Sequence, residues 1–276
     1  MLEPIAFYRV SGAGNDFLAL VEPAARPDPS QIASWCRRGL SLGADGLFIL
    51  ERGGTGIRMH YFNADGGVAA LCLNGTRCAA SLAFSLGWER EETVIETGAG
   101  PVPARRLSAT AVEIEIDAPP LPRQRSPQVD GREITGFFLD VGVPYFVVPW
   151  EEDLALAPVT PLGRALRHHL ELGKAGANID FVRFPEARRL EIRTYERGVE
   201  EETLASGTGM IAGVAVGRAL GRLEATVSVL TAGGYELEVS ASSKDRWTLS
   251  GDARVVARGE ILPAAADLPP RPRWTP

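Results

Sequence analysis

The sequence contains few of the residues that build disulfide frameworks, metal sites and membrane spans. Its 276 residues include three cysteines and three histidines. The cysteines, Cys36, Cys72 and Cys78, are odd in number and lack Cys-x-x-Cys spacing, which argues against a disulfide framework or a zinc site. No apolar run approaches the roughly 18 residues that a membrane helix needs. We therefore expect neither a metal site nor association with a membrane. Whether one of the cysteines is a functional thiol stays an open question.

An excess of positive charge is also missing. The formal net charge is −6, whereas a nucleic-acid surface needs an excess of Lys and Arg. We therefore expect no nucleic-acid partner. Residues 1–7 carry an early acid and a proline and lack the charged-then-apolar pattern of a signal peptide, so we expect a cytoplasmic protein. Apolar residues make up 45%, as in ordinary globular proteins, and the length suits two domains of about 150 residues each.

An internal repeat supports this division into two domains. Shifting the sequence by 134 residues aligns Tyr61 with Tyr195, Gly75 with Gly209, Gly87 with Gly221, and Thr97 with Thr231. Each half also predicts the same element order, with strands over 56–63 and 189–195 and helices over 75–86 and 207–220. A loop is predicted over 196–205. The proline-rich segment 118–122 marks the boundary, which predicts one domain over 1–119 plus 259–276 and another over 120–258.

The same shift places Cys72 on Ser206, each directly before a predicted helix. One interpretation is that both are small helix-capping residues. The other is an acid–base pair, because inverting a stereocentre next to a carboxylate needs a base on one face and an acid on the other. Thiols suit this task because their pKa, ordinarily near 8.5, falls at a helix N-terminus. The free N–H groups there bind a carboxylate and stabilise the negative charge that grows on it.

Several motifs resemble those of diaminopimelate epimerases. Residues 11–17, Ser-Gly-Ala-Gly-Asn-Asp-Phe, are similar to the family's opening His-Gly-x-Gly-Asn-Asp-Phe, and residues 43–47 resemble its Gly-Ala-Asp-Gly-Leu segment. Residues 63–66 with 72–78 resemble the first catalytic cysteine motif, and residues 196–209 resemble the second. The matches keep the family's order and spacing over most of the chain.

This resemblance implies an α/β (α+β) fold of two pseudo-symmetric β/α domains, each a curled sheet around a central helix, with the active site between them. It implies interconversion of LL- and meso-2,6-diaminopimelate in lysine biosynthesis, without pyridoxal phosphate or another cofactor, by a homodimer. Cys72 and Ser206 match the catalytic positions. The positions matching substrate-binding residues are Asn15, Asn63, Leu73, Asn74, Asn178, Glu196, Arg197, Gly207 and Thr208.

Three residues depart from the family pattern. Ser206 replaces the second cysteine, and Leu73 replaces a glycine, where we expect it to strain a glycine-type backbone. Tyr145 replaces a histidine that, by the resemblance, assists the first catalytic thiol, here Cys72. These departures leave open a related amino-acid racemase, a one-base dehydratase, or a catalytically silent binding protein.

Overall fold

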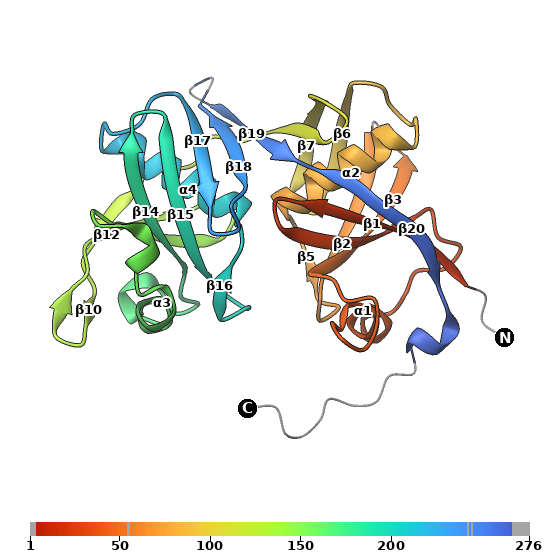
Figure 1. Ribbon diagram of the computed structural model, residues 1–276, viewed down its shortest axis with the longest axis horizontal. Coiled ribbons are helices and arrows are strands. Elements are labelled where there is room, and N and C mark those ends of the chain that lie inside the picture. The colour runs from red at the N-terminus through yellow and green to blue at the C-terminus, as the bar shows by residue number, and fades with distance from the viewer. Residues whose placement is uncertain (1–3, 54–55, 242, 244, 267–276) are drawn as a thin grey trace. The chain divides into compact units, whose positions relative to one another are not determined.

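The computed structural model describes residues 4–53, 56–241, 243 and 245–266 (Figure 1). The chain divides into two compact domains, Met1–Val112 with Ala253–Pro276, and Glu113–Asp252. The part of the predicted segment 259–276 that follows residue 266 lies outside the described residues. None of the helices in the described ranges is both long and apolar enough to cross a membrane.

The observed boundaries lie several residues before the expected ones, which corrects the division at 119 and 258. Strand β8 (Ala111–Asp117) pairs with β19 (Arg246–Asp252), so most of β8 belongs to the second domain. Strand β20 (Arg254–Ile261) pairs antiparallel with β1 (Ile5–Gly12) along almost its whole length, so it belongs entirely to the first. Backbone pairing, rather than the prolines, decides where each domain ends.

The first domain is a curled sheet with a simple pairing pattern. Its strands are β1 and β20, together with β2 (Asn15–Val21), β3 (Gly46–Gly53), β4 (Gly56–Asn63), β5 (Val68–Ala69), β6 (Glu92–Thr97) and β7 (Gly100–Arg106). Strands β1 and β2 are antiparallel, β2 and β3 parallel, β3 and β4 antiparallel, β4 and β6 parallel, and β6 and β7 antiparallel. Strand β5 pairs with the end of β4.

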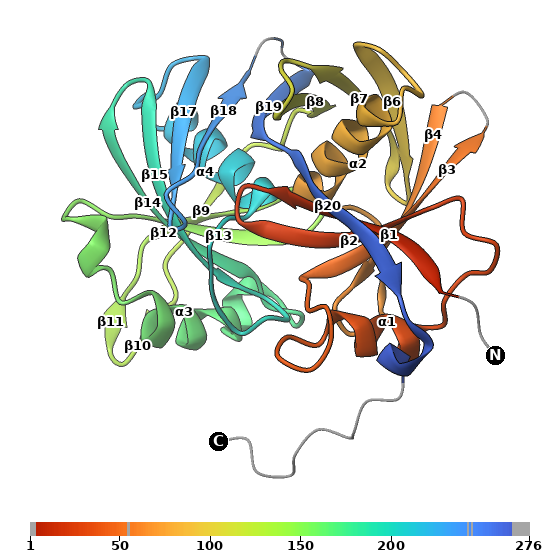
Figure 2. The ribbon, with the colours of Figure 1, turned by 45° about the vertical axis from the view of Figure 1, so that its right-hand side comes forward.

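The second domain repeats this pattern (Figure 2). Its strands are β19 and most of β8, together with β9 (Arg123–Arg125), β12 (Gly136–Asp140), β13 (Pro144–Pro149), β14 (Asn178–Glu186), β15 (Arg189–Glu196), β16 (Glu201–Thr203), β17 (Thr226–Thr231) and β18 (Glu236–Ser240). From β12 to β18 the order of antiparallel and parallel pairings is the one from β1 to β7. A small hairpin, β10 (Gln128–Val129) and β11 (Arg132–Glu133), lies beside them. The mixed α/β fold with duplicated halves is confirmed.

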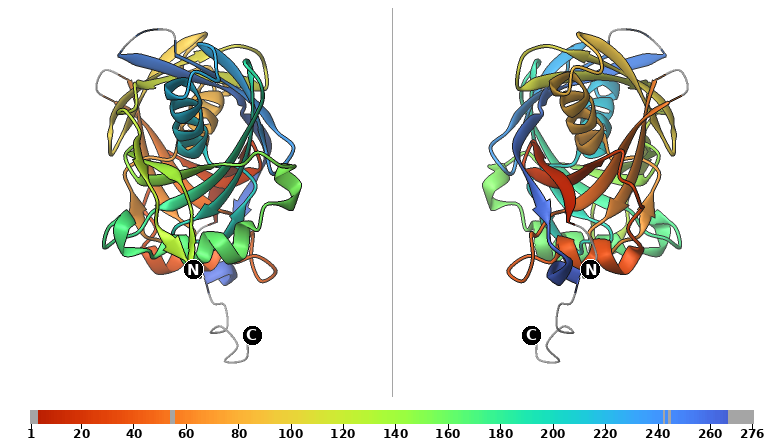
Figure 3. Two further views of the ribbon diagram at one scale, coloured as in Figure 1. Left: turned by 90° about the vertical axis from the view of Figure 1, so that its left-hand side faces the viewer. Right: turned by 90° about the vertical axis from the view of Figure 1, so that its right-hand side faces the viewer.

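One helix runs through the middle of each domain. Helix α2 (Leu73–Ser85) is buried at every residue from Leu73 to Phe84 and contacts strands β1, β2, β4, β6, β7 and β20. Helix α4 (Gly207–Ala219) is similarly buried and contacts β13, β14, β15 and β18. A helix that is buried on all sides needs other elements to cover each of its faces. Figure 3 shows α4 in its left-hand view and α2 in its right-hand view, each among the strands of its own domain.

The two central helices begin and end alike. Cys72 and Ser206 are their N-caps, with extended backbones at φ −140° and −125°. Each helix ends before a glycine with positive φ, Gly87 at 71° and Gly221 at 69°, as the sequence predicts. Helix α2 begins two residues before its predicted start because the cysteine side chain itself caps it.

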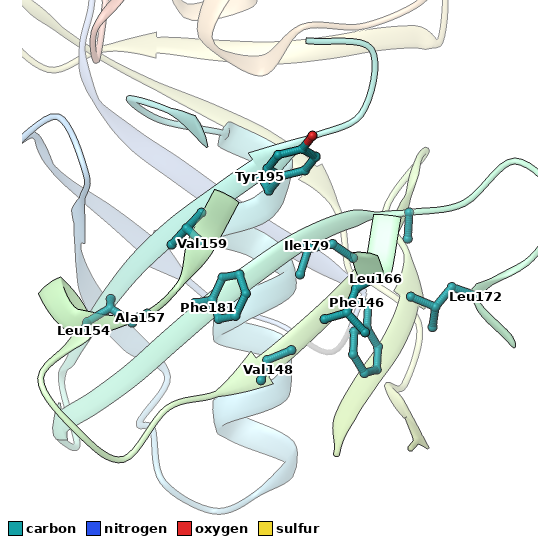
Figure 4. Close-up of a cluster of buried hydrophobic side chains, with 11 residues drawn as sticks. Phe146, Val148, Leu154, Ala157, Val159, Leu166, Leu172, Ile179, Phe181 and Tyr195 are labelled. Atoms are coloured by element: carbon teal, nitrogen blue, oxygen red, sulfur yellow. The ribbon is translucent and has the colours of Figure 1, made fainter. Parts of the chain in front are cut away.

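Shorter helices cover the outer face of each sheet. In the second domain, α3 (Val159–Arg167) packs on β14 and β15 through a cluster that includes Phe146, Leu166 and Phe181 (Figure 4). In the first, α1 (Pro29–Cys36) packs through Ile32 and Trp35. The 3₁₀ turns are η1 (Leu154–Leu156), η2 (Leu170–Leu172) and η3 (Pro263–Ala266).

Two strands near the second central helix differ from their predicted bounds. Strand β15 extends one residue beyond the prediction, to Glu196, and the predicted loop over 196–205 contains strand β16. That part of the prediction is wrong. The segment is rich in glutamate and has low strand propensity, but antiparallel pairing of Tyr195 with Glu202 imposes the extended conformation.

Candidate active site

In the first domain, the cysteine at the start of α2 is the accessible one. Cys72 is half-buried, whereas Cys36 and Cys78 are buried. The Cys72 Sγ accepts a hydrogen bond from the Gly75 N–H, with an S–N distance of 3.4 Å. A Cβ atom on Gly75 would be in ordinary contact with that sulfur, at 3.4 Å, and in tight contact with Met59 Cε, at 3.2 Å. The start of α2 therefore holds a thiol at fixed position.

Three of the family-like motifs meet beside this thiol. The amide of Asn74, which is 2% exposed, donates to Asn15 Oδ1 at 2.7 Å and accepts from Arg77 at 2.9 Å. Asn15 in turn donates to Asp45 Oδ2 at 3.1 Å. These contacts tie the opening motif, the 43–47 segment and the first cysteine motif into one network. Arg38 donates to Asp45 at 2.7 Å and holds it from the other side.

The remaining predicted residues of this domain are placed differently. Asn63 ends β4 and is exposed, with its backbone N–H bonded to Gly67 O at 2.8 Å. Leu73 is 4% exposed and is the first residue of α2. It is not among the non-glycine residues with positive φ, so the expected backbone strain is wrong. A helical residue at this position needs no glycine.

In the second domain, Ser206 stands at the start of α4 in the same geometry. Its Oγ accepts a hydrogen bond from the Gly209 N–H, with an O–N distance of 3.3 Å, and the residue is 8% exposed. Gly207 is buried and Thr208 half-buried. The helix rule leaves the N–H groups of residues 207 and 208, like those of residues 73 and 74, without an intrahelical acceptor. Each helix start therefore offers one capping side chain and donors for an anion.

Tyr145 contacts the second helix start. Its hydroxyl lies 2.8 Å from Ser206 Oγ and 2.6 Å from Thr208 Oγ1. Burial raises the pKa of Tyr145, and the nearby carboxylates of Asp180 and Glu196 raise it further, so the side chain stays a neutral phenol. By the family resemblance, the side chain at this position assists the Cys72 thiol. In this structure the Tyr145 hydroxyl is instead hydrogen-bonded to Ser206.

Three other predicted residues lie close together at the ends of β14 and β15. Asn178 opens β14 beside Tyr145 of β13 in parallel register. Its Oδ1 accepts from the Arg197 N–H at 2.7 Å, and its Nδ2 donates to Pro144 O at 3.4 Å. Glu196, the last residue of β15, and Arg197 are both half-buried. Asn178 therefore fixes the backbone that carries Arg197.

A buried carboxyl group next to α4 was not identified from the sequence. Asp180 is 0% exposed and accepts from Thr194 Oγ1 at 2.7 Å. Burial raises its pKa to about 7, and the negative charge of Glu196 adds to the rise. A Cβ atom on Gly209 would lie 3.0 Å from Asp180 Oδ2, so glycine gives the buried carboxyl room beside the helix. The available signal was an acid within the apolar run Ile179 to Val182.

The two helix starts suit acid–base chemistry on a carboxylic acid. A thiol and a hydroxyl can each move a proton, and the helix N–H groups can hold a carboxylate. Among the described residues, no group of three or more His, Cys, Asp or Glu side chains could hold a metal ion.

Comparison with known proteins identifies the family. A family model described as diaminopimelate epimerase matches residues 7–118 and 137–256, which is most of both domains. The chain belongs to the diaminopimelate epimerase family. A diaminopimelate epimerase of Aquifex aeolicus is 34% identical over 86% of this chain and 90% of its own. One from Gemmatimonas aurantiaca is 35% identical over 93% of this chain and 99% of its own.

Solved structures show the same fold at lower identity. A PhzF-family phenazine biosynthesis protein of Enterococcus faecalis has a TM-score of 0.72 and 16% identity, covering 94% of this chain and 100% of its own. A probable proline racemase of Agrobacterium radiobacter has a TM-score of 0.68 and 16% identity, covering 95% of each chain. At these identities the likeness concerns the fold alone.

Proposed function

We propose that this member of the epimerase family is an isomerase that interconverts LL- and meso-2,6-diaminopimelate by proton transfer at the α-carbon, without a cofactor. The observation that carries the proposal is the equivalence of the two helix starts. Cys72 and Ser206 cap topologically equivalent helices with similar backbone angles, and each accepts a bond from the N–H three residues on. The 32–35% identity to proteins named diaminopimelate epimerase supports the choice of substrate.

In the proposed reaction the two helix starts contribute different groups. The Cys72 thiolate removes the α-proton, and the electron pair of the broken C–H bond delocalises into the substrate carboxylate. Helix N–H groups at residues 73, 74, 207 and 208 stabilise that charge. Ser206 then donates a proton to the other face of the α-carbon. In the reverse direction the roles exchange, with the serine oxygen as the base.

The remaining predicted residues bind the substrate in this proposal. Asn15, Asn63, Asn74 and Asn178 hold its polar groups, the Arg197 guanidinium pairs with its distal carboxylate, and Glu196 pairs with its ammonium group. Leu73, Gly207 and Thr208 contribute at the helix starts. We also propose that the enzyme works as a homodimer in the cytoplasm.

Solvent deuterium exchange tests the proposal. The purified protein is incubated in D₂O with LL- and meso-diaminopimelate separately, and α-deuterium is followed by mass spectrometry. We expect deuterium in both stereoisomers. Cys72→Ala is expected to abolish exchange, whereas Cys36→Ala, which removes a buried thiol of the same domain, serves as the control for folding and is expected to retain it.

The other outcomes contradict the proposal in distinct ways. Exchange from one stereoisomer without epimerisation indicates a one-base enzyme. Exchange only with another amino acid, from a panel of enantiomers, indicates a racemase of different specificity. Binding without any exchange indicates a catalytically silent protein, and full activity of Cys72→Ala shows that another residue is the base.

A further inference from the structure

Three hydroxyl groups form a chain at the start of α4. The Tyr145 oxygen lies 2.8 Å from Ser206 Oγ and 2.6 Å from Thr208 Oγ1. Ser206 Oγ also accepts a hydrogen bond from the Gly209 N–H at 3.3 Å. Tyr145 is 1% exposed, so close packing in the second domain fixes its position.

Each hydroxyl has one hydrogen, and if both neighbours donated to Tyr145 the buried phenol hydrogen would have no acceptor, so the chain points in one of two directions. In one, Ser206 donates to Tyr145 and Tyr145 donates to Thr208, which occupies the serine hydrogen. In the other, Thr208 donates to Tyr145 and Tyr145 donates to Ser206. The serine oxygen then accepts from both Tyr145 and Gly209, and its own hydrogen is available to a substrate.

The second direction is the one that assists proton donation. As the serine O–H bond breaks, negative charge grows on Oγ, and two donors plus the positive end of α4 stabilise it. Because burial raises the pKa of Tyr145, the phenol keeps its hydrogen and remains a donor. A serine without these donors is a far weaker acid than the cysteine it replaces.

We propose that Tyr145 is a positioning residue, which donates its hydroxyl hydrogen to Ser206 and thereby directs the serine proton to the α-carbon of the substrate. This inference rests on the proposed function. The carbanion's electron pair forms the new C–H bond as the Ser206 O–H bond breaks. After product leaves, solvent water returns a proton to the serine oxygen and takes the proton from the Cys72 thiol, which restores both groups. Two departures from the family pattern, Ser206 and Tyr145, thus act together in one proton-transfer step.

A partition experiment on Tyr145→Phe tests this role. The substrate is the stereoisomer whose α-proton Cys72 removes, and the reaction runs in D₂O. Two rates are compared: the appearance of deuterium in the recovered starting isomer (exchange) and the formation of the other isomer (epimerisation). Loss of the donor slows delivery from Ser206 but not removal by Cys72, so the ratio of exchange to epimerisation rises about 10²-fold. Tyr195→Phe, which removes another buried hydroxyl, bonded at 2.7 Å to Glu200 O, leaves the ratio unchanged. Equal slowing of exchange and epimerisation by Tyr145→Phe overturns the inference.

A second measurement needs no substrate. In a Cys72→Ala background, Ser206→Cys introduces a thiol whose ionisation is followed by thiolate absorbance across pH. If Tyr145 donates to position 206, the pH midpoint is lower by about one unit than when Tyr145→Phe is also present. Equal midpoints overturn the inference. Absence of exchange and epimerisation in the unsubstituted protein refutes the proposed function, and with it the delivery of the serine proton to a substrate. The midpoint comparison then still decides whether Tyr145 donates to position 206.

Discussion

Asp180→Asn is expected to stabilise the protein at neutral and alkaline pH. The carboxyl group of Asp180 is fully buried and its pKa is about 7, against 3.8 for an ordinary aspartate. Among the described residues, Oδ2 has no hydrogen-bond partner. The asparagine amide cannot ionise, yet its Oδ1 can still accept the hydrogen bond from Thr194. The substitution therefore removes a buried group that resists becoming charged.

The magnitude follows from proton linkage. Below about pH 4 the carboxyl is protonated in both the folded and the unfolded chain, so its contribution to stability is fully present there. Between pH 4 and 7 the unfolded chain loses this proton first, which lowers the free energy of unfolding by about 1.4 kcal/mol per pH unit. The loss reaches about 4 kcal/mol near pH 7 and stays constant above it. Asp180→Asn is not subject to this loss.

Urea unfolding between pH 4 and 9 measures the effect. We expect the parent and Asp180→Asn to have similar free energies of unfolding at pH 4 and to diverge by up to about 4 kcal/mol by pH 8. Asp130→Asn is the control for removal of one negative charge, because Asp130 is exposed and its φ of 50° suits asparagine. A constant difference between parent and Asp180→Asn at all pH values would refute the reasoning.

The remaining predictions concern the site and the backbone. Ser206→Cys is expected to raise the epimerisation rate by about 10²-fold, because a thiol is a better general acid than a hydroxyl; no gain in a steady-state assay would contradict this. Iodoacetamide is expected to modify Cys72 first and to stop turnover, because Cys72 is half-buried whereas burial raises the pKa of Cys36 to about 12; peptide mass spectrometry showing earlier modification elsewhere would argue against it. Gly176→Ala is expected to destabilise the fold by about 3 kcal/mol in urea, since its φ is 65° and a Cβ would lie 1.9 Å from a backbone oxygen. Gly173→Ala, with φ 99° and nothing within 4 Å, tests the conformational strain alone, and an equal loss in both variants would exclude the steric explanation.

Local signals in the sequence located the elements that position the site. Alternation of apolar and polar residues predicts the strand over 56–63, and β4 has those bounds. Glycines after the helices predict their ends, because glycine has no Cβ and adopts positive φ more readily than other residues. The 134-residue repeat predicts the equivalence of Cys72 and Ser206, and each residue is the N-cap of its central helix. The first two signals lie within a few residues of the feature they predict, whereas the repeat is read from the whole sequence.

The contacts that complete the site depend on distant segments. Tyr145 reaches Ser206 because β13 and β14 pair in parallel beside α4, whereas the family resemblance predicts that a side chain at this position assists the Cys72 thiol. Asp180 is a buried acid because β14 packs against α4, which places its carboxyl group next to Gly209. Sequence patterns determined the duplicated elements, their caps and the two helix-start residues, because these follow from backbone geometry along the chain. Strand register and packing, which join residues far apart in sequence, decided the domain boundaries, the partner of Tyr145 and the environment of Asp180.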